Sequence, residues 1–298
     1  MRRLTLAALV LAALSSGALG DSGAGLRAFD AEDYATAYRE LLPAAEAGEP
    51  KAQYVLGLIF DAGLGRDKDP AGAVKWVEKA ATQGHDEAQR TLGIFYEEGK
   101  GVARDYRAAA HWYRLAADQG NVKAERNLGD LYFAGKGVRQ SYTLAADWFA
   151  RATEAGNAKA KRSLAYMYFQ GRGVEQDRAR AAELFAESAG TGYGKAEFDL
   201  GYAYFHGIGV EQDRARAATL FLNAAKAGHA RAQIFVGHMY AIGDGIEQSY
   251  QEAWFWLQLA ARQRPKLAAH YIKEIKGAVP AAEKEVAERR MSGWIPAD

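Results

Sequence analysis

Residues 196–213 read AEFDLGYAYFHGIGVEQD, and this stretch decides the fold because its pattern recurs six times at a spacing of 36 residues. The alanine that opens each copy stands at Ala52, Ala88, Ala124, Ala160, Ala196 and Ala232. Two glycines separated by one residue follow each alanine at a constant distance, at Gly207 and Gly209 in the quoted copy. A fixed period of this length is typical of stacked repeat arrays, in which each unit contacts only its neighbours.

Each copy is predicted to form two helices joined by a long turn. In the second copy Ala88, Leu92 and Phe95 recur at helical spacing, and the two glycines that follow supply the positive φ that ends the helix. Asp105 is then a favourable N-cap for the second helix. The equivalent positions hold Asp69, Ser141, Asp177, Asp213 and Ser249. Stacked helical hairpins predict an all-α fold, an α-solenoid.

The ends of the chain depart from this pattern. Arg2 and Arg3 precede an apolar run over residues 4–14 and small residues before position 21, which is the form of a secretory signal. The run is shorter than the ~20 residues that span a bilayer, which disfavours an uncleaved anchor. We expect a signal peptide over 1–20, an N-terminal capping half-repeat over 21–51, six 36-residue repeats over 52–267 and C-terminal capping helices over 268–298.

Charge and cysteine content exclude several classes of partner and chemistry. Removing residues 1–20 removes two arginines and no acidic residue, so 38 Lys+Arg become 36 against 37 Asp+Glu. A net charge of −1 gives no general attraction for nucleic acid or an anionic membrane surface. The chain has no cysteine, which excludes disulfides and a thiolate nucleophile. We expect no integral membrane segment after cleavage and a periplasmic or secreted protein.

The repeated pattern A-x-x-x-L-G-x-x-Y-x-x-G-x-G-V-x-x-D resembles the Sel1-like repeat, a relative of the tetratricopeptide repeat with a longer turn inside the hairpin. The resemblance covers residues 33 to about 276. It departs locally at Arg66, Ala165, Leu184 and Leu220. The resemblance implies a right-handed superhelix that binds proteins or peptides, and similar bacterial members are often periplasmic regulators or adaptors. A cysteine-rich branch has been linked to β-lactam binding, and this chain lacks its cysteines.

The search for catalytic and cofactor motifs yields nothing. Ser-x-x-Lys, Gly-x-Ser-x-Gly and His-Glu-x-x-His are absent. The segment 93–100 superficially suggests a phosphate loop, but its spacing is wrong and Gly101 stands where Ser or Thr should bind magnesium. His206, His229 and His238 could meet across two repeats, but isolated surface histidines explain them better than a metal site. We expect no catalytic residue, cofactor or metal.

A binding surface is expected where the repeat leaves residue identity free. Positions 3, 7 and 10 of each copy point away from the core face of the first helix, and in hairpin solenoids of this kind the first helices line the concave side. These positions mix arginine with aromatic residues, which often dominate interface energy. The predicted partner-binding residues are Arg90, Arg126, Phe133, Arg162, Tyr166, Phe169, Phe198, Tyr202, Phe205 and His238.

Such a surface suits a peptide or helix with acidic and apolar side chains, because the arginines could pair with its carboxylates. The competing interpretation is that superhelical curvature buries the column of Phe133, Phe169 and Phe205. The sequence thus predicts a non-catalytic protein- or peptide-binding scaffold or adaptor of the bacterial cell envelope. Two alternatives remain: an envelope hydrolase or binder of β-lactams or cell-wall peptides, and a purely structural scaffold.

Overall fold

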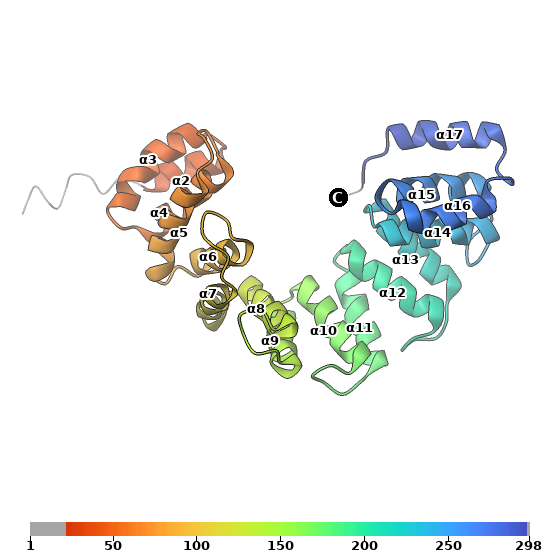
Figure 1. Cartoon of the computed structure of the whole chain (residues 1–298), viewed down its shortest axis with the longest axis horizontal. Helices are drawn as coiled ribbons and strands as arrows, with labels where there is room; N and C mark the ends of the chain where they lie inside the picture. Colours follow the sequence, from red (N-terminus) through yellow and green to blue (C-terminus); the bar gives the residue numbers. More distant parts are fainter. Residues whose placement is uncertain (1–21, 297–298) are drawn as a thin grey trace, which may run out of the picture. The chain divides into compact units, whose positions relative to one another are not determined.

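The computed structural model describes residues 22–296, and every regular element in that range is a helix (Figure 1). Sixteen helices, α2 to α17, occupy these residues, and no strand occurs among them. The predicted all-α solenoid of helical hairpins is confirmed. The predicted signal segment, residues 1–20, lies outside the described residues.

The helices fall into two compact units that divide between Ser141 and Tyr142, inside the third copy of the repeat. The first unit contains α2 (Ser22–Asp30), α3 (Tyr34–Glu46), α4 (Pro50–Ala62), α5 (Pro70–Thr82), α6 (Asp86–Glu98), α7 (Tyr106–Asp118) and α8 (Val122–Ala134). The second contains α9 (Tyr142–Glu154), α10 (Ala158–Gln170), α11 (Arg178–Ala189), α12 (Gly194–His206), α13 (Arg214–Lys226), α14 (Ala230–Ile242), α15 (Tyr250–Gln263), α16 (Pro265–Ile275) and α17 (Ala281–Ser292).

Packing within each unit follows the chain order. The first helix of a copy packs on the second, as α6 packs on α7 and α12 on α13, and each second helix packs on the next first helix. A glycine in the first helix allows this close approach. A Cβ added at Gly93 would lie 2.6 Å from the ring of Tyr113, a side chain with no solvent exposure. The small residue that recurs inside the first helix therefore makes room for a large side chain of the second.

Side-chain caps begin both helices of a hairpin. The predicted caps of the second helices are confirmed at Asp69, Asp105, Asp177, Asp213 and Ser249, each of which accepts from a backbone N–H of the first turn. The first helices carry caps that we had not expected. The side chains of His85, Asn121, Asn157 and His229 accept from the N–H three residues on.

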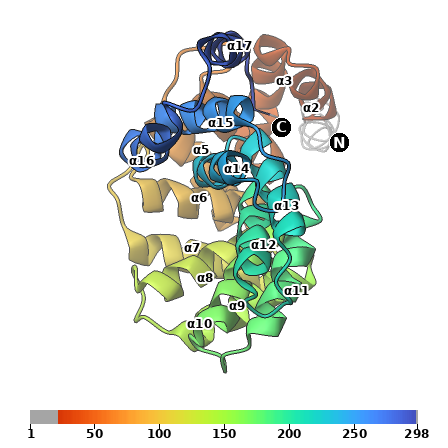
Figure 2. The same ribbon diagram turned by 90° about the vertical axis from the view of Figure 1, so that its right-hand side faces the viewer.

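The two ends of the described chain are closed by additional helices. Helix α3 begins at its cap Asp33, as expected of a second helix, but α2 precedes it and packs on it, so a hairpin stands where a half-repeat was predicted. At the other end, the residue ranges of α16 and α17 are close to the range predicted for the C-terminal capping helices. Figures 1 and 2 both show α17 alongside α15, and the Trp294 side chain packs on the core of the second unit.

Candidate functional site

The ten residues predicted to bind a partner lie on first helices of both units. The first unit holds Arg90 on α6 and Arg126 and Phe133 on α8. The second unit holds Arg162, Tyr166 and Phe169 on α10, Phe198, Tyr202 and Phe205 on α12, and His238 on α14. Arg90 and Arg126 line one polar hollow of the first unit, while Tyr166, Phe169, Phe198 and Tyr202 line one apolar cavity of the second.

All three predicted arginines already pair with carboxylates of this chain. Arg90 Nε lies 3.0 Å from Glu87 Oε2, and Arg126 Nε donates to Asp130 Oδ2 at 2.9 Å. Arg162 Nε donates to Asp199 Oδ2 at 2.5 Å. A partner's carboxylates would therefore compete with internal ones for these arginines, which sequence position alone did not show.

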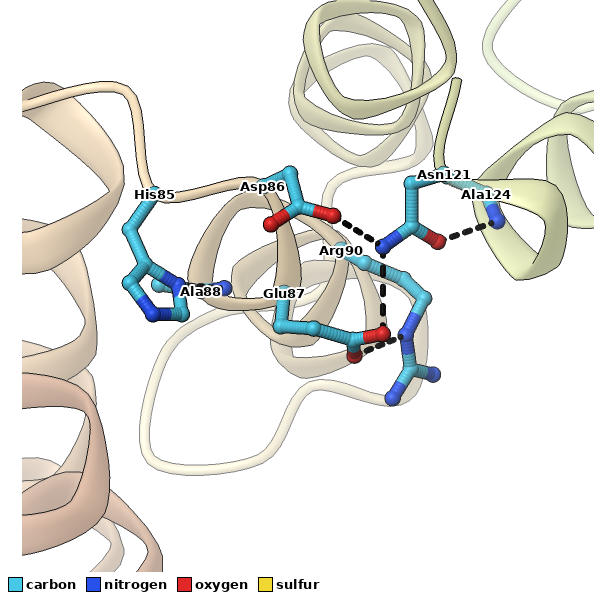
Figure 3. A network of polar contacts seen from close by, with 7 residues as sticks. All are labelled: His85, Asp86, Glu87, Ala88, Arg90, Asn121 and Ala124. Carbon is cyan, nitrogen blue, oxygen red and sulfur yellow. Dashed lines mark hydrogen bonds and ion pairs between the residues drawn. The ribbon is translucent and has the colours of Figure 1, made fainter. Parts of the chain in front are cut away.

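The Arg90 pair belongs to a polar network that joins consecutive first helices of the first unit (Figure 3). The Asn121 amide donates to Asp86 Oδ2 at 2.7 Å and to Glu87 Oε1 at 3.2 Å. Its carbonyl oxygen accepts from the Ala124 N–H at 3.0 Å and so begins α8. Asn121 is 7% exposed, so its amide needs these partners. The network explains Arg90 as part of the contact between repeats.

The side chains of Phe133, Phe169 and Phe205 are half-buried. They are neither fully exposed on a binding surface nor fully buried, which were the two interpretations left open by the sequence. In the second unit the Phe205 ring packs beside Phe221 and Phe235 at centroid distances of 6.1 and 5.7 Å. The neighbouring Phe198 is only 5% exposed and belongs to the core. The aromatic residues thus serve the packing of adjacent repeats and also present part of their rings at the surface.

An apolar cavity of about 120 Å³ lies among α10, α11 and α12 of the second unit. Aromatic rings and alanines form most of its lining, and Arg178 and Arg231 are its cationic members. The lining residues are Tyr166, Phe169, Arg178, Ala181, Ala182, Phe185, Phe198, Asp199, Tyr202, Ala203, Ile208 and Arg231. Four residues from the predicted set therefore converge on a single hollow.

One wall of the cavity carries a buried carboxylate whose two oxygens are both engaged. Asp199 accepts from Arg162 Nε on one oxygen and from the Tyr166 hydroxyl on the other, at 2.5 Å each. Desolvation raises the pKa of Asp199, while the charge of Arg162 opposes that rise. Burial, and next the charge of Asp199, raise the pKa of Tyr166. Burial is thus the first cause of both shifts, and the two hydrogen bonds and the Arg162 charge make Asp199 part of a structural ion pair.

A cationic hollow adjoins the apolar cavity and shares Arg231 with it. Lys195, Arg264 and His229 also line this hollow. Burial, and then the charges of Arg162, Arg231, Lys195 and Arg264, lower the pKa of His229 to about 4. These cations were not among the residues predicted from the sequence. The available signal was that Arg264 stands where other copies have glycine, at Gly84, Gly120, Gly156, Gly192 and Gly228.

The histidines considered as metal ligands have other contacts. His229 caps α14, His206 stacks on Tyr202 at a centroid distance of 4.2 Å, and His238 packs against Tyr271 at 5.0 Å. Among residues 22–296 no group of three histidine, cysteine, aspartate or glutamate side chains could hold a metal ion. None of the helices in that range has the length and apolar character needed to cross a bilayer.

Comparison with known proteins places this chain in a family. The model of the Sel1 repeat matches six consecutive segments, residues 50–85, 86–121, 122–157, 158–190, 194–229 and 230–264. The chain belongs to the Sel1 repeat family. Proteins built from the Sel1 repeat are typically protein-interaction scaffolds, and the family is generally non-catalytic. A search of curated proteins gave no match.

Two solved Sel1-type structures are similar over most of this chain. A Sel1 repeat protein from Oxalobacter formigenes is 33% identical with a TM-score of 0.76, and the match covers 82% of this chain and 97% of that one. The second is c5321, described as a protective antigen of uropathogenic Escherichia coli strains with an SLR fold. It is 31% identical with a TM-score of 0.78, and the match covers 97% of this chain and 64% of c5321. The chain described here thus spans less than two thirds of the length of c5321.

Proposed function

We propose that this Sel1 repeat protein is an exported, non-catalytic scaffold or adaptor of the bacterial cell envelope. It binds a protein or peptide segment on the surface formed by its first helices. The observation that supports this proposal is the convergence of Tyr166, Phe169 and Tyr202 on one apolar cavity that opens beside cationic side chains. The proposed export rests on the form of residues 1–20.

The second unit offers what a binding surface for a protein segment requires. Its aromatic rings stand on the consecutive first helices α10 and α12, and those of α12 pack on the core of the unit, so little freedom is lost when a partner binds. Half-buried aromatic side chains around a hollow are typical of the residues that contribute most to interface energy. An apolar segment side chain can enter the cavity while cationic groups at its edge contact polar parts of the same segment.

Affinity capture tests the binding proposal. The mature chain, residues 21–298, is immobilised and exposed to an envelope extract of the source bacterium, beside a Phe169→Ala/Tyr202→Ala variant. Trp112→Ala serves as the control, because it removes a half-buried aromatic ring from α7, a second helix of the first unit that lies outside the proposed surface. We expect an envelope protein that the wild type and the control retain and the double variant loses. Identical captured sets on all three would contradict the proposed surface.

Mass spectrometry tests the proposed export. The protein is expressed with all 298 residues, and the periplasmic and cytoplasmic fractions are analysed separately. We expect a periplasmic product that begins at Asp21. A full-length product confined to the cytoplasm would overturn the envelope assignment and leave the binding proposal to be judged by the capture experiment.

A further inference from the structure

One position of the repeat changes from large to small in the fifth copy alone. The eighth residue of the other copies is Ile59, Phe95, Leu131, Met167 or Met239, and each is at most 2% exposed. The fifth copy has Ala203 there. A large buried side chain at this position fills space beside its helix, so alanine there leaves space open on the side of α12 that faces α11 of the preceding copy.

The apolar cavity lies at this position. Ala203 is part of its lining, together with Phe185 of the facing helix α11 and Tyr202 and Ile208 of its own copy. Its volume of about 120 Å³ can be compared with an engineered apolar cavity of about 150 Å³ that holds a benzene molecule. The space beside Ala203 therefore suits one large apolar side chain, such as that of Leu, Met or Phe.

The cations beside the cavity carry charge that can pair with an anion, although the charge of Arg231 also acts on Asp199. Within residues 22–296, Lys195, Arg231 and Arg264 form no ion pair with this chain, unlike the three arginines predicted from the sequence. The Arg231 guanidinium lies 5.1 Å from the ring centroid of Phe198, which lines the cavity. Arg231 therefore connects the apolar cavity directly to the cationic hollow.

The charges act together on the residue between them. His229 packs on Phe198 at a centroid distance of 4.6 Å, and its pKa is lowered by burial first and then by the charges of Arg162, Arg231, Lys195 and Arg264. A field that disfavours a proton on a histidine favours a carboxylate nearby. The cationic hollow is thus suited to acidic side chains, which the apolar cavity is not.

We propose that the fifth repeat holds an anchor site, formed by the cavity beside Ala203 and by Lys195, Arg231 and Arg264. It binds one large apolar side chain of a partner segment whose neighbouring residues are acidic. This inference rests on the proposed function and assigns the chemistry of the segment that is bound. Binding buries the apolar side chain against Phe185 and Phe198 and pairs its acidic neighbours with the three cations.

A random-peptide library displayed on phage tests the anchor site on the mature chain. We expect the selected peptides to share one large apolar residue with at least two acidic residues close to it. A synthetic peptide of the selected sequence is then measured by fluorescence polarisation. Replacing its apolar residue by Ala, or its acidic residues by Asn and Gln, should each weaken binding by about tenfold or more.

Variants of the protein separate the two parts of the site. Ala203→Met restores the residue found at Met167 and Met239, so it should fill the cavity, leave the thermal midpoint unchanged or higher, and weaken peptide binding about tenfold or more. Phe169→Ala gives a second measure without added volume and should also weaken binding. Lys195→Glu/Arg231→Glu should abolish binding of the acidic peptide, whereas Lys159→Glu, at the position equivalent to Lys195 in the fourth copy, should not.

Several results would overturn the anchor site. They are selected peptides without acidic residues, unchanged affinity in a folded Ala203→Met variant, or no enriched peptide at all. Preferential binding of a single-stranded oligonucleotide probe would also overturn it. Capture of an envelope protein that is insensitive to Ala203→Met would leave the proposed function standing and reject only this site.

Discussion

Asp199 of α12 accepts a hydrogen bond from Arg162 of α10 at 2.5 Å, although the two residues lie 37 positions apart along the chain. Asp199 is 7% exposed, and Arg162 retains 27% of its side-chain exposure. The pair joins the fourth and fifth copies of the repeat in the wall of the cavity. Removing one partner leaves a desolvated charge without compensation, which costs more than the pair itself contributes.

Asp199→Asn should lower the free energy of unfolding by about 3 kcal/mol, because Arg162 would then be charged and largely desolvated without an anion. The new amide still offers an oxygen to the Tyr166 hydroxyl, so the loss comes mainly from the ion pair. Urea unfolding of the full chain measures the change. Glu183→Gln is the control, since it breaks the exposed Arg180–Glu183 pair of the same unit and should cost less than about 1 kcal/mol. Equal effects would contradict a structural role for the Arg162–Asp199 pair.

The two glycines of each turn have different roles, although the sequence pattern treats them alike. Gly207 and Gly209 have φ values of 67° and 72°, so both adopt the left-handed conformation. A Cβ at Gly207 would meet only Gln212, at the ordinary contact distance of 3.4 Å. A Cβ at Gly209 would overlap the carbonyl group of Arg178, at the start of the second helix of the preceding copy. Only the second glycine is needed for the approach of neighbouring repeats.

Gly207→Ala should lower the free energy of unfolding by about 1 to 2 kcal/mol, because alanine is strained in the left-handed conformation. Gly209→Ala should cost clearly more, about 3 kcal/mol or above, because the backbone of the preceding copy must also move. Thermal or urea unfolding of the two single variants makes the comparison within one turn. If the two losses are the same, the contact with Arg178 does not constrain the stack.

The features of this structure that could be predicted are those that short segments of the sequence determine. The period, the turn glycines and the caps such as Asp213 follow from short segments, and the structure confirms them. The contacts of Arg162 with Asp199 could not be predicted, because they depend on how consecutive repeats are rotated against each other. The change to alanine at Ala203 can be read from the sequence. The cavity beside it could not be predicted, because that requires knowing that the equivalent residues of the other copies are buried. Helix α2 was missed because residues 22–30 carry no copy of the repeat pattern.

Asn121 combines a helix cap with a contact between repeats, and the second role requires a neutral side chain that can donate hydrogen bonds. Asp is normally as good an N-cap as Asn, yet Asn121→Asp would place a carboxylate against Asp86 and Glu87. We expect a loss of about 2 kcal/mol in the free energy of unfolding, because two hydrogen bonds to carboxylates are replaced by repulsion. Asn157→Asp is the control, since the residues equivalent to Asp86 and Glu87 one copy on are Val122 and Lys123.

A double-mutant cycle isolates this contact from the cap. Asp86→Asn introduces an amide donor facing position 121, so Asp86→Asn combined with Asn121→Asp should recover most of the loss. Additive losses in the double variant would show that the contact between repeats contributes little.

His229 caps α14 through an unprotonated ring nitrogen, which makes this cap sensitive to pH. The Ala232 N–H donates to Nδ1 at 3.2 Å, so Nδ1 cannot carry a proton while the cap is formed. Burial, and then the nearby cations, lower the pKa of His229 to about 4, whereas an unfolded histidine titrates near about 6.5. Between these values the unfolded chain binds more protons than the folded chain.

The stability that depends on neutral His229 should therefore be complete above about pH 6.5 and decrease as the pH falls toward about 4. His229→Asn provides the comparison, because asparagine forms the same cap at Asn121 and Asn157 and has no proton to gain. We expect the variant to be less stable than the wild type at pH 7, through loss of the stacking on Phe198, and to lose less stability on acidification. Urea unfolding across this range and NMR titration of His229 measure both quantities. A titration near the unfolded value, or parallel pH profiles, would show that neither burial nor the surrounding cations act on this histidine.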